Sequence, residues 1–101
     1  MENVLDALKH VGTSFPTDEG TRLADVLFSL KIDDWTNVTI DLRKMPAGLL
    51  ISAFFNAFLQ RIHEEKAERL NQARGIKWKL AYPFQEKNVQ EWMKDFEPYT
   101  P

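Results

Sequence analysis

Apolar and polar residues alternate in two stretches of the chain. Val38, Ile40 and Leu42 are separated by single polar residues. This period of two predicts a strand with one buried face and one face in water. A second alternation over residues 76–82 predicts another strand of the same kind, with Trp78 on its inward side.

Three other stretches repeat apolar residues every three or four positions, which predicts amphipathic helices. These helices are expected at residues 18–31, 48–74 and 86–96, with Thr17 as the cap of the first. The middle helix is the most apolar and would be roughly 40 Å long at 1.5 Å per residue, so it would overhang a small sheet. Residues 1–12 fit either a helix or a strand.

Two strands joined by a helix of this length run parallel, through a right-handed crossover. The chain of 101 residues is long enough for one hydrophobic core. The sequence therefore predicts a single α/β domain over residues 1–101. Its small sheet is expected to be mainly parallel or mixed, with helices largely on one face and the other face open unless a partner covers it.

Composition excludes several classes of function. A formal net charge of −2 gives no reason to expect binding to nucleic acid or to an anionic membrane. The absence of cysteine excludes disulfides and thiolate catalysis, and the N-terminus breaks its apolar residues with charges, unlike a signal peptide. His10 and His63 are the only histidines and lack further ligands at metal-binding spacing. We expect a cytoplasmic protein without a cofactor or metal and without membrane or nucleic-acid partners.

The apolar middle helix keeps one narrow polar strip. Ser52, Asn56, Gln60 and His63 follow one another at helical spacing. Where the helix starts decides what Ser52 can do. A start at residue 46 or 47 turns Ser52 sideways in the second turn, whereas a start near residue 50 puts it in the first turn, where the helix dipole stabilises anions. The sequence leaves both starts open.

The stretch V-T-I-D-L-R-K-M-P-A-G-L-L-I-S-A-F-F, residues 38–55, carries a resemblance to a known family. A hydrophobic strand ending in Asp-Leu, a turn and a Ser-x-Phe helix start resemble the STAS-like domains of unknown function, which are relatives of anti-sigma-factor antagonists. Thr21-Arg22-Leu23, following Thr17-Asp18-Glu19-Gly20, also resembles that family's segment before its first helix. The resemblance covers roughly residues 17–82.

The resemblance implies a small sheet with helices mostly on one face and a first strand at residues 3–9. It also implies a Ser phosphorylated by a histidine-kinase-like ATPase partner, and Ser52 stands at that position. Two departures weaken this reading. Ala53 replaces the family's second Ser, and Ile51 replaces the Asp that precedes the phospho-acceptor. Without phosphorylation, Ser52 is simply a small polar residue of the strip.

We therefore expect a non-enzymatic regulatory module that binds a protein partner and is a monomer or weak homodimer. Asp41, at the end of the central strand, is either a partner contact or charge sensor beside Ser52, or else a solvent-facing strand residue or a cap for the following turn. A phage or mobile-element inhibitor that masks a host protein is one alternative. A small hydrolase or transferase using Ser52 and His63 is another. The residues expected to bind the partner are Asp41, Lys44, Pro46, Gly48, Leu49, Ser52 and Asn56.

Overall fold

A computed structural model describes residues 3–99. Within this range, three strands form a parallel sheet in the order β1-β2-β3: β1 (Asn3–Asp6), β2 (Val38–Asp41) and β3 (Lys77–Lys79). The helix α1 (Pro16–Ser29) connects β1 to β2, and α2 (Ser52–Lys66) followed by α3 (Leu70–Arg74) connects β2 to β3. The helix α4 (Pro83–Asp95) follows β3. The predicted α/β architecture is confirmed.

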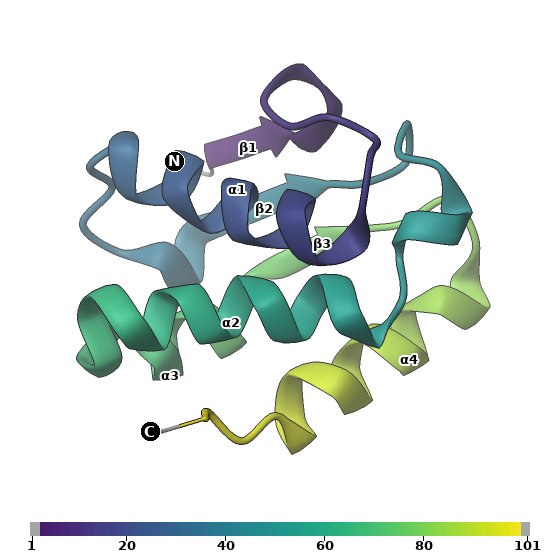
Figure 1. Cartoon of the computed structure of the whole chain (residues 1–101). Coiled ribbons are helices and arrows are strands. Elements are labelled where there is room, and N and C mark those ends of the chain that lie inside the picture. Colours follow the sequence, from purple (N-terminus) through teal and green to yellow (C-terminus); the bar gives the residue numbers. More distant parts are fainter. Residues whose placement is uncertain (1–2, 100–101) are drawn as a thin grey trace.

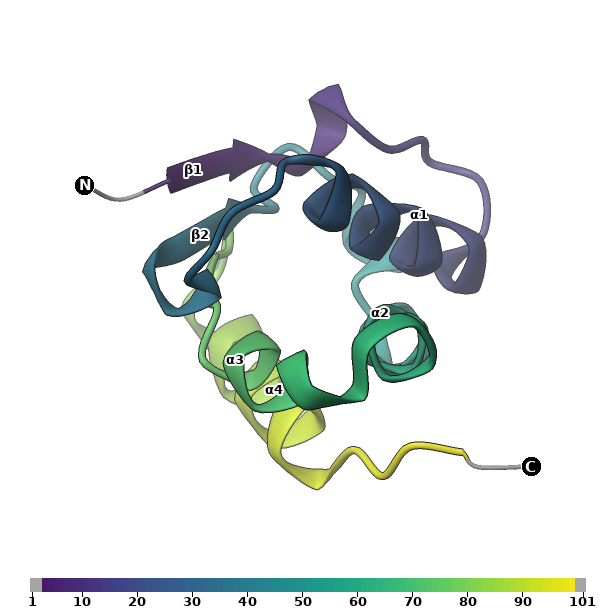
Figure 2. The same cartoon turned by 90° about the vertical axis from the view of Figure 1, so that its left-hand side faces the viewer.

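The helices cover one face of the sheet (Figures 1 and 2). In register across the strands, Leu5, Ile40 and Trp78 point to the helices. Val4 and Lys77 flank Thr39 on the opposite face and are exposed. The alternation in the sequence arises because only one face of this parallel sheet is covered by the chain's own helices.

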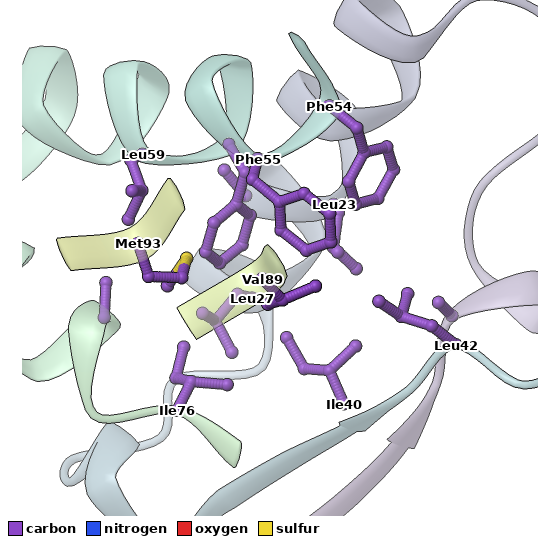
Figure 3. Packing of buried hydrophobic residues seen from close by; sticks show 14 of the residues in the cluster. Leu23, Leu27, Ile40, Leu42, Phe54, Phe55, Leu59, Ile76, Val89 and Met93 are labelled. Carbon is purple, nitrogen blue, oxygen red and sulfur yellow. The ribbon is translucent and has the colours of Figure 1, made fainter. Parts of the chain in front are cut away.

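The core lies between the sheet and the three long helices. Phe54, Phe55 and Leu59 of α2 point down onto side chains of α1, α4 and β2, as Figure 3 shows. The ring of Phe55 contacts both Trp78 and Trp92, at 5.2 and 5.6 Å between centroids. The apolar stripe of α2 is therefore the centre of the packing, as its hydrophobicity predicts.

Two features hold α1 in place. Gly20 lies so close to α2 that a Cβ atom built on it would be 2.1 Å from the carbonyl oxygen of Phe54. Glu19 is fully buried, and its carboxylate accepts hydrogen bonds from the backbone N–H groups of Gly12 and Ser14 at 3.1 and 3.0 Å and pairs with Arg22. The loop between β1 and α1 is thereby fixed to the first turn of α1.

The predicted single helix over residues 48–74 is wrong. The backbone is extended at Ile51, and a 3₁₀ turn at Ala67–Arg69 separates α2 from α3. An unbroken helix of that length would exceed the largest extent of the molecule, 34 Å. The break turns α3 back, so that Leu70 and Ala73 reach the core.

Smaller corrections concern the ends of elements. Thr17 does not cap α1, because Pro16 occupies the first helical position, where its fixed φ and missing N–H cost nothing, and Phe15 precedes it as the N-cap residue. Pro83 starts α4 in the same way, three residues earlier than predicted, so β3 is shorter than the alternation of residues 76–82. At the N-terminus, the strand that the family resemblance implied is present as β1 but ends at Asp6.

Candidate functional site

The carboxyl ends of the three parallel strands lie at one end of the molecule, at the right in Figure 1. The connection from β2 to α2, residues 42–51, and the junction of β3 with α4 meet there. Ligands of open parallel sheets gather outside the carboxyl ends of the strands. Most of the side chains that the sequence singles out belong to this end.

Ser52 is the first residue of α2, and it is exposed. The helix thus takes the later of the two starts that the sequence left open. Ile51 provides no side-chain cap for the helix, and the N–H of Phe54 bonds to the carbonyl of Ile51 at 3.0 Å. The Ser52 hydroxyl therefore stands in the first turn, where an anion is favoured by the helix dipole.

Asp41 forms the turn after β2. Its carboxylate accepts a backbone hydrogen bond from Arg43 N–H at 3.0 Å and two from the Arg43 guanidinium at 3.0 and 2.8 Å. The hydrogen bond from the Arg43 side chain lowers the pKa of Asp41 from 3.8 to about 2. The adjacent Lys44 reaches across to Asp6 at the end of β1, with 3.2 Å between Nζ and Oδ2. Of the readings left open for Asp41, its contacts match the cap for the following turn.

The other expected contact residues are divided between surface and core. Pro46, Gly48 and Asn56 are exposed, with Asn56 one helical turn beyond Ser52. Leu49 is only 7% exposed and belongs to the hydrophobic core. Its side chain therefore anchors the loop from inside and is not available to a partner.

A pocket of about 180 Å³ opens at this end, and sequence reasoning missed it. Two rings form its rim: Tyr82 and Phe84 stack with 5.7 Å between centroids and 15° between planes, and they are 54% and 69% exposed. Gln85 fixes this turn by accepting a hydrogen bond from Tyr82 N–H at 3.1 Å. The pocket is lined by Ala47, Leu50, Tyr82, Phe84, Gln85, Asn88 and Trp92.

One signal in the sequence points to this rim. Phe84 lies outside the apolar stripe of α4, which Val89 and Met93 continue inward, so a large ring there has no place in the core. Ile51 is also 43% exposed, beside the pocket residue Leu50. We call the exposed group at this end of the sheet the end surface, and its members are Lys44, Pro46, Gly48, Ile51, Ser52, Tyr82 and Phe84.

The polar strip of α2 is only partly open. The Gln60 amide donates to the carbonyl of Tyr99 at 3.0 Å and accepts from Tyr99 N–H at 2.8 Å, so the C-terminal segment covers the middle of the strip. His63 lies eleven residues from Ser52 on the same helix, about 16 Å along its axis, too far for direct proton transfer. The Ser52 and His63 pair of the hydrolase alternative therefore does not form.

Three further observations concern nucleic acid, membranes and metal ions as possible ligands. The ring of Trp78 packs inward against Phe55 and Phe58, as predicted, and is not presented to a base. Across residues 3–99, no helix has the length and apolar character needed to span a bilayer. In the same range, no group of three or more His, Asp or Glu side chains is arranged to hold a metal ion. Comparison of the chain with protein-family models, curated proteins and solved structures found no match.

Proposed function

We propose that this chain is a cytoplasmic regulatory module, without enzymatic activity, that binds another protein through the end surface. The observation that carries the proposal is the exposure of Ile51, Tyr82 and Phe84 around an apolar pocket at the carboxyl end of the sheet. Exposed aromatic residues beside a small pocket are typical of the energetic centre of a protein interface.

Ser52 is the proposed switch of this surface. It is exposed, it is the first residue of α2, and it lies next to Ile51 in the end surface. A phosphate there would add about −1.5 to −2 charges at neutral pH. The helix dipole would stabilise this charge by about 0.3–1 kcal/mol. The family resemblance adds a histidine-kinase-like ATPase as the partner that supplies the phosphate.

The test uses the full chain and a purified histidine-kinase-like ATPase from the same source cell. After incubation with ATP, intact-mass and peptide mass spectrometry should find one phosphate, on Ser52, and none on a Ser52→Ala variant. A Phe84→Asp variant should bind the ATPase at least about tenfold more weakly, because an exposed ring that the complex would bury is replaced by a charge.

The outcomes separate the two parts of the proposal. Binding that depends on Phe84 but leaves Ser52 unmodified would remove the switch and keep the module. Binding of the ATPase with equal affinity by Phe84→Asp would contradict the proposed surface. As a matched control, Leu30→Ala removes an exposed apolar side chain at the C-cap of α1, outside the end surface. It should leave binding unchanged.

A further inference from the structure

The pocket of the end surface has room for one side chain. Its volume of about 180 Å³ is below the range of roughly 300–1,000 Å³ of pockets that enclose small-molecule ligands. Leu50 and Trp92 line it with apolar atoms, and Gln85 and Asn88 are its only amide side chains. These dimensions and this chemistry fit a single bulky aliphatic or aromatic side chain of another protein.

The charges around this end are not presented equally to the solvent. The side chains of Arg43 and Lys44 are 56% and 66% exposed, whereas those of their carboxylate partners, Asp41 and Asp6, are 13% and 20% exposed. The carboxylates are recessed in the sheet, and the cationic groups project from it.

Further along the same end, Lys79 of β3 is exposed. Glu86 and Lys87, adjacent and exposed on α4, are of opposite sign and offset each other. At the carboxyl ends of β2 and β3 the projecting groups Arg43, Lys44 and Lys79 are therefore positive, although the chain as a whole carries a formal net charge of −2.

From these two features we infer that the partner presents an acidic segment with one bulky apolar side chain, which enters the pocket while its carboxylates face Arg43, Lys44 and Lys79. The inference rests on the proposed function and names the chemistry of the partner. It also sets the direction of the switch. A phosphate on Ser52 brings negative charge to the same surface, so it weakens the complex with an acidic partner.

The test is a titration of the ¹⁵N-labelled full chain with a blocked helical peptide of Ala and Glu that carries one central Trp. Two matched peptides replace either the Trp by Ala or every Glu by Lys. We expect the amide signals of Ala47, Leu50, Phe84 and Asn88 to shift with the first peptide. Both matched peptides should bind at least about tenfold more weakly, the effect of losing one anchor or one set of complementary charges.

Substitutions in the protein, in place of changes to the peptide, test the same contacts. Phe84→Ala and Lys44→Glu should each weaken binding of the acidic Trp peptide at least about fivefold. Leu30→Ala and Lys94→Glu, which change exposed residues just after α1 and in the last turn of α4, should leave it unchanged. Circular dichroism of each variant shows whether it is folded.

Three results would overturn the inference: no shifts with the acidic Trp peptide, equal binding of the Lys peptide, or shifts confined to residues outside both the end surface and its pocket. None of these results would contradict the proposed function, because that depends on the effect of Phe84→Asp on the ATPase complex. If the ATPase binds in a Phe84-dependent manner but the peptides do not discriminate charge, the module stands and the acidic partner is excluded.

Discussion

Replacing Gly20 by Ala should destabilise the protein, although helix propensity favours the opposite result. In the interior of a helix, Ala is more favourable than Gly by about 0.5–1 kcal/mol. Gly20 lies in α1, where this gain would apply. The new Cβ atom, however, would lie 2.1 Å from the carbonyl oxygen of Phe54 and 3.3 Å from the Cβ of Ala57.

The severity of this steric clash decides whether the substitution stabilises or destabilises the protein. Cβ contacts below 3.0 Å are essentially never observed, so α1 and α2 would have to separate by 3.0 − 2.1 = 0.9 Å. The obstructing atom belongs to backbone and cannot rotate away, so the cost is at the upper end of the about 1–3 kcal/mol typical of an overpacked core. After subtraction of the helix propensity, the free energy of unfolding should fall by about 2 kcal/mol. For a domain of this size, that lowers the melting temperature by roughly 10 °C.

Urea denaturation followed by tryptophan fluorescence measures this change, because Trp35 is fully buried. Gly48→Ala is the matched control. A Cβ on Gly48 would have no neighbour within 4 Å, so this variant should be neutral or gain up to about 1 kcal/mol. If Gly20→Ala unfolds at the same or a higher urea concentration than the wild type, the close contact between α1 and α2 is refuted.

Two further predictions concern the turn after β2 and the C-terminal segment. Arg43→Gln should lower the free energy of unfolding at pH 7 by about 1 kcal/mol. The lowered pKa of Asp41 corresponds to roughly 2 kcal/mol at most, and solvent around the exposed Arg43 reduces it. A depressed carboxyl pKa stabilises fully above the unfolded value of 3.8, and this contribution is lost as pH falls through the folded value of about 2. The difference between variant and wild type should therefore vanish in urea titrations over that pH range; a difference that persists would contradict the assignment. Gln60→Ala should increase hydrogen exchange at the Tyr99 amide severalfold and leave the amides of β2 protected, since two hydrogen bonds to Tyr99 are lost; unchanged exchange would show that Gln60 does not hold the segment.

Local periodicity was sufficient to predict the elements that bury one face. Val38 and Ile40 are fully buried in β2, and Leu23 and Leu27 form the buried stripe of α1. These residues follow the period of their element because the core lies on one side of it. The length of the helix after β2 could not be predicted in this way. Good helix formers continue through residues 63–74, but a 3₁₀ turn interrupts the helix at Ala67–Arg69, and beyond it Leu70 and Ala73 reach the core.

The site was predictable where it depends on neighbours in sequence. Asp41 at the end of a strand is a local feature, and the structure has it. For Ser52 the sequence left two helix starts open, and the structure takes the later one, with Ser52 as the first residue of α2. Contacts between distant residues left no local signal. Gln60 bonds to Tyr99, 39 residues away, and Lys44 bonds to Asp6, 38 residues away. Leu49 is buried because the 3₁₀ turn before α2 rotates its side chain inward, which the composition of the loop does not reveal.

The contact at Gly20 also bears on how the proposed switch would work. Phe54, whose carbonyl lies against Gly20, is two residues after Ser52 in the first turn of α2. The start of α2 is therefore held by the backbone of α1, and the buried rings of Phe54 and Phe55 hold it from below. A phosphate gains about 0.3–1 kcal/mol from the helix start, whereas moving that start would break a close-packed core. On the proposed function, phosphorylation of Ser52 would change the charge that a partner meets and leave the shape of the end surface as it is.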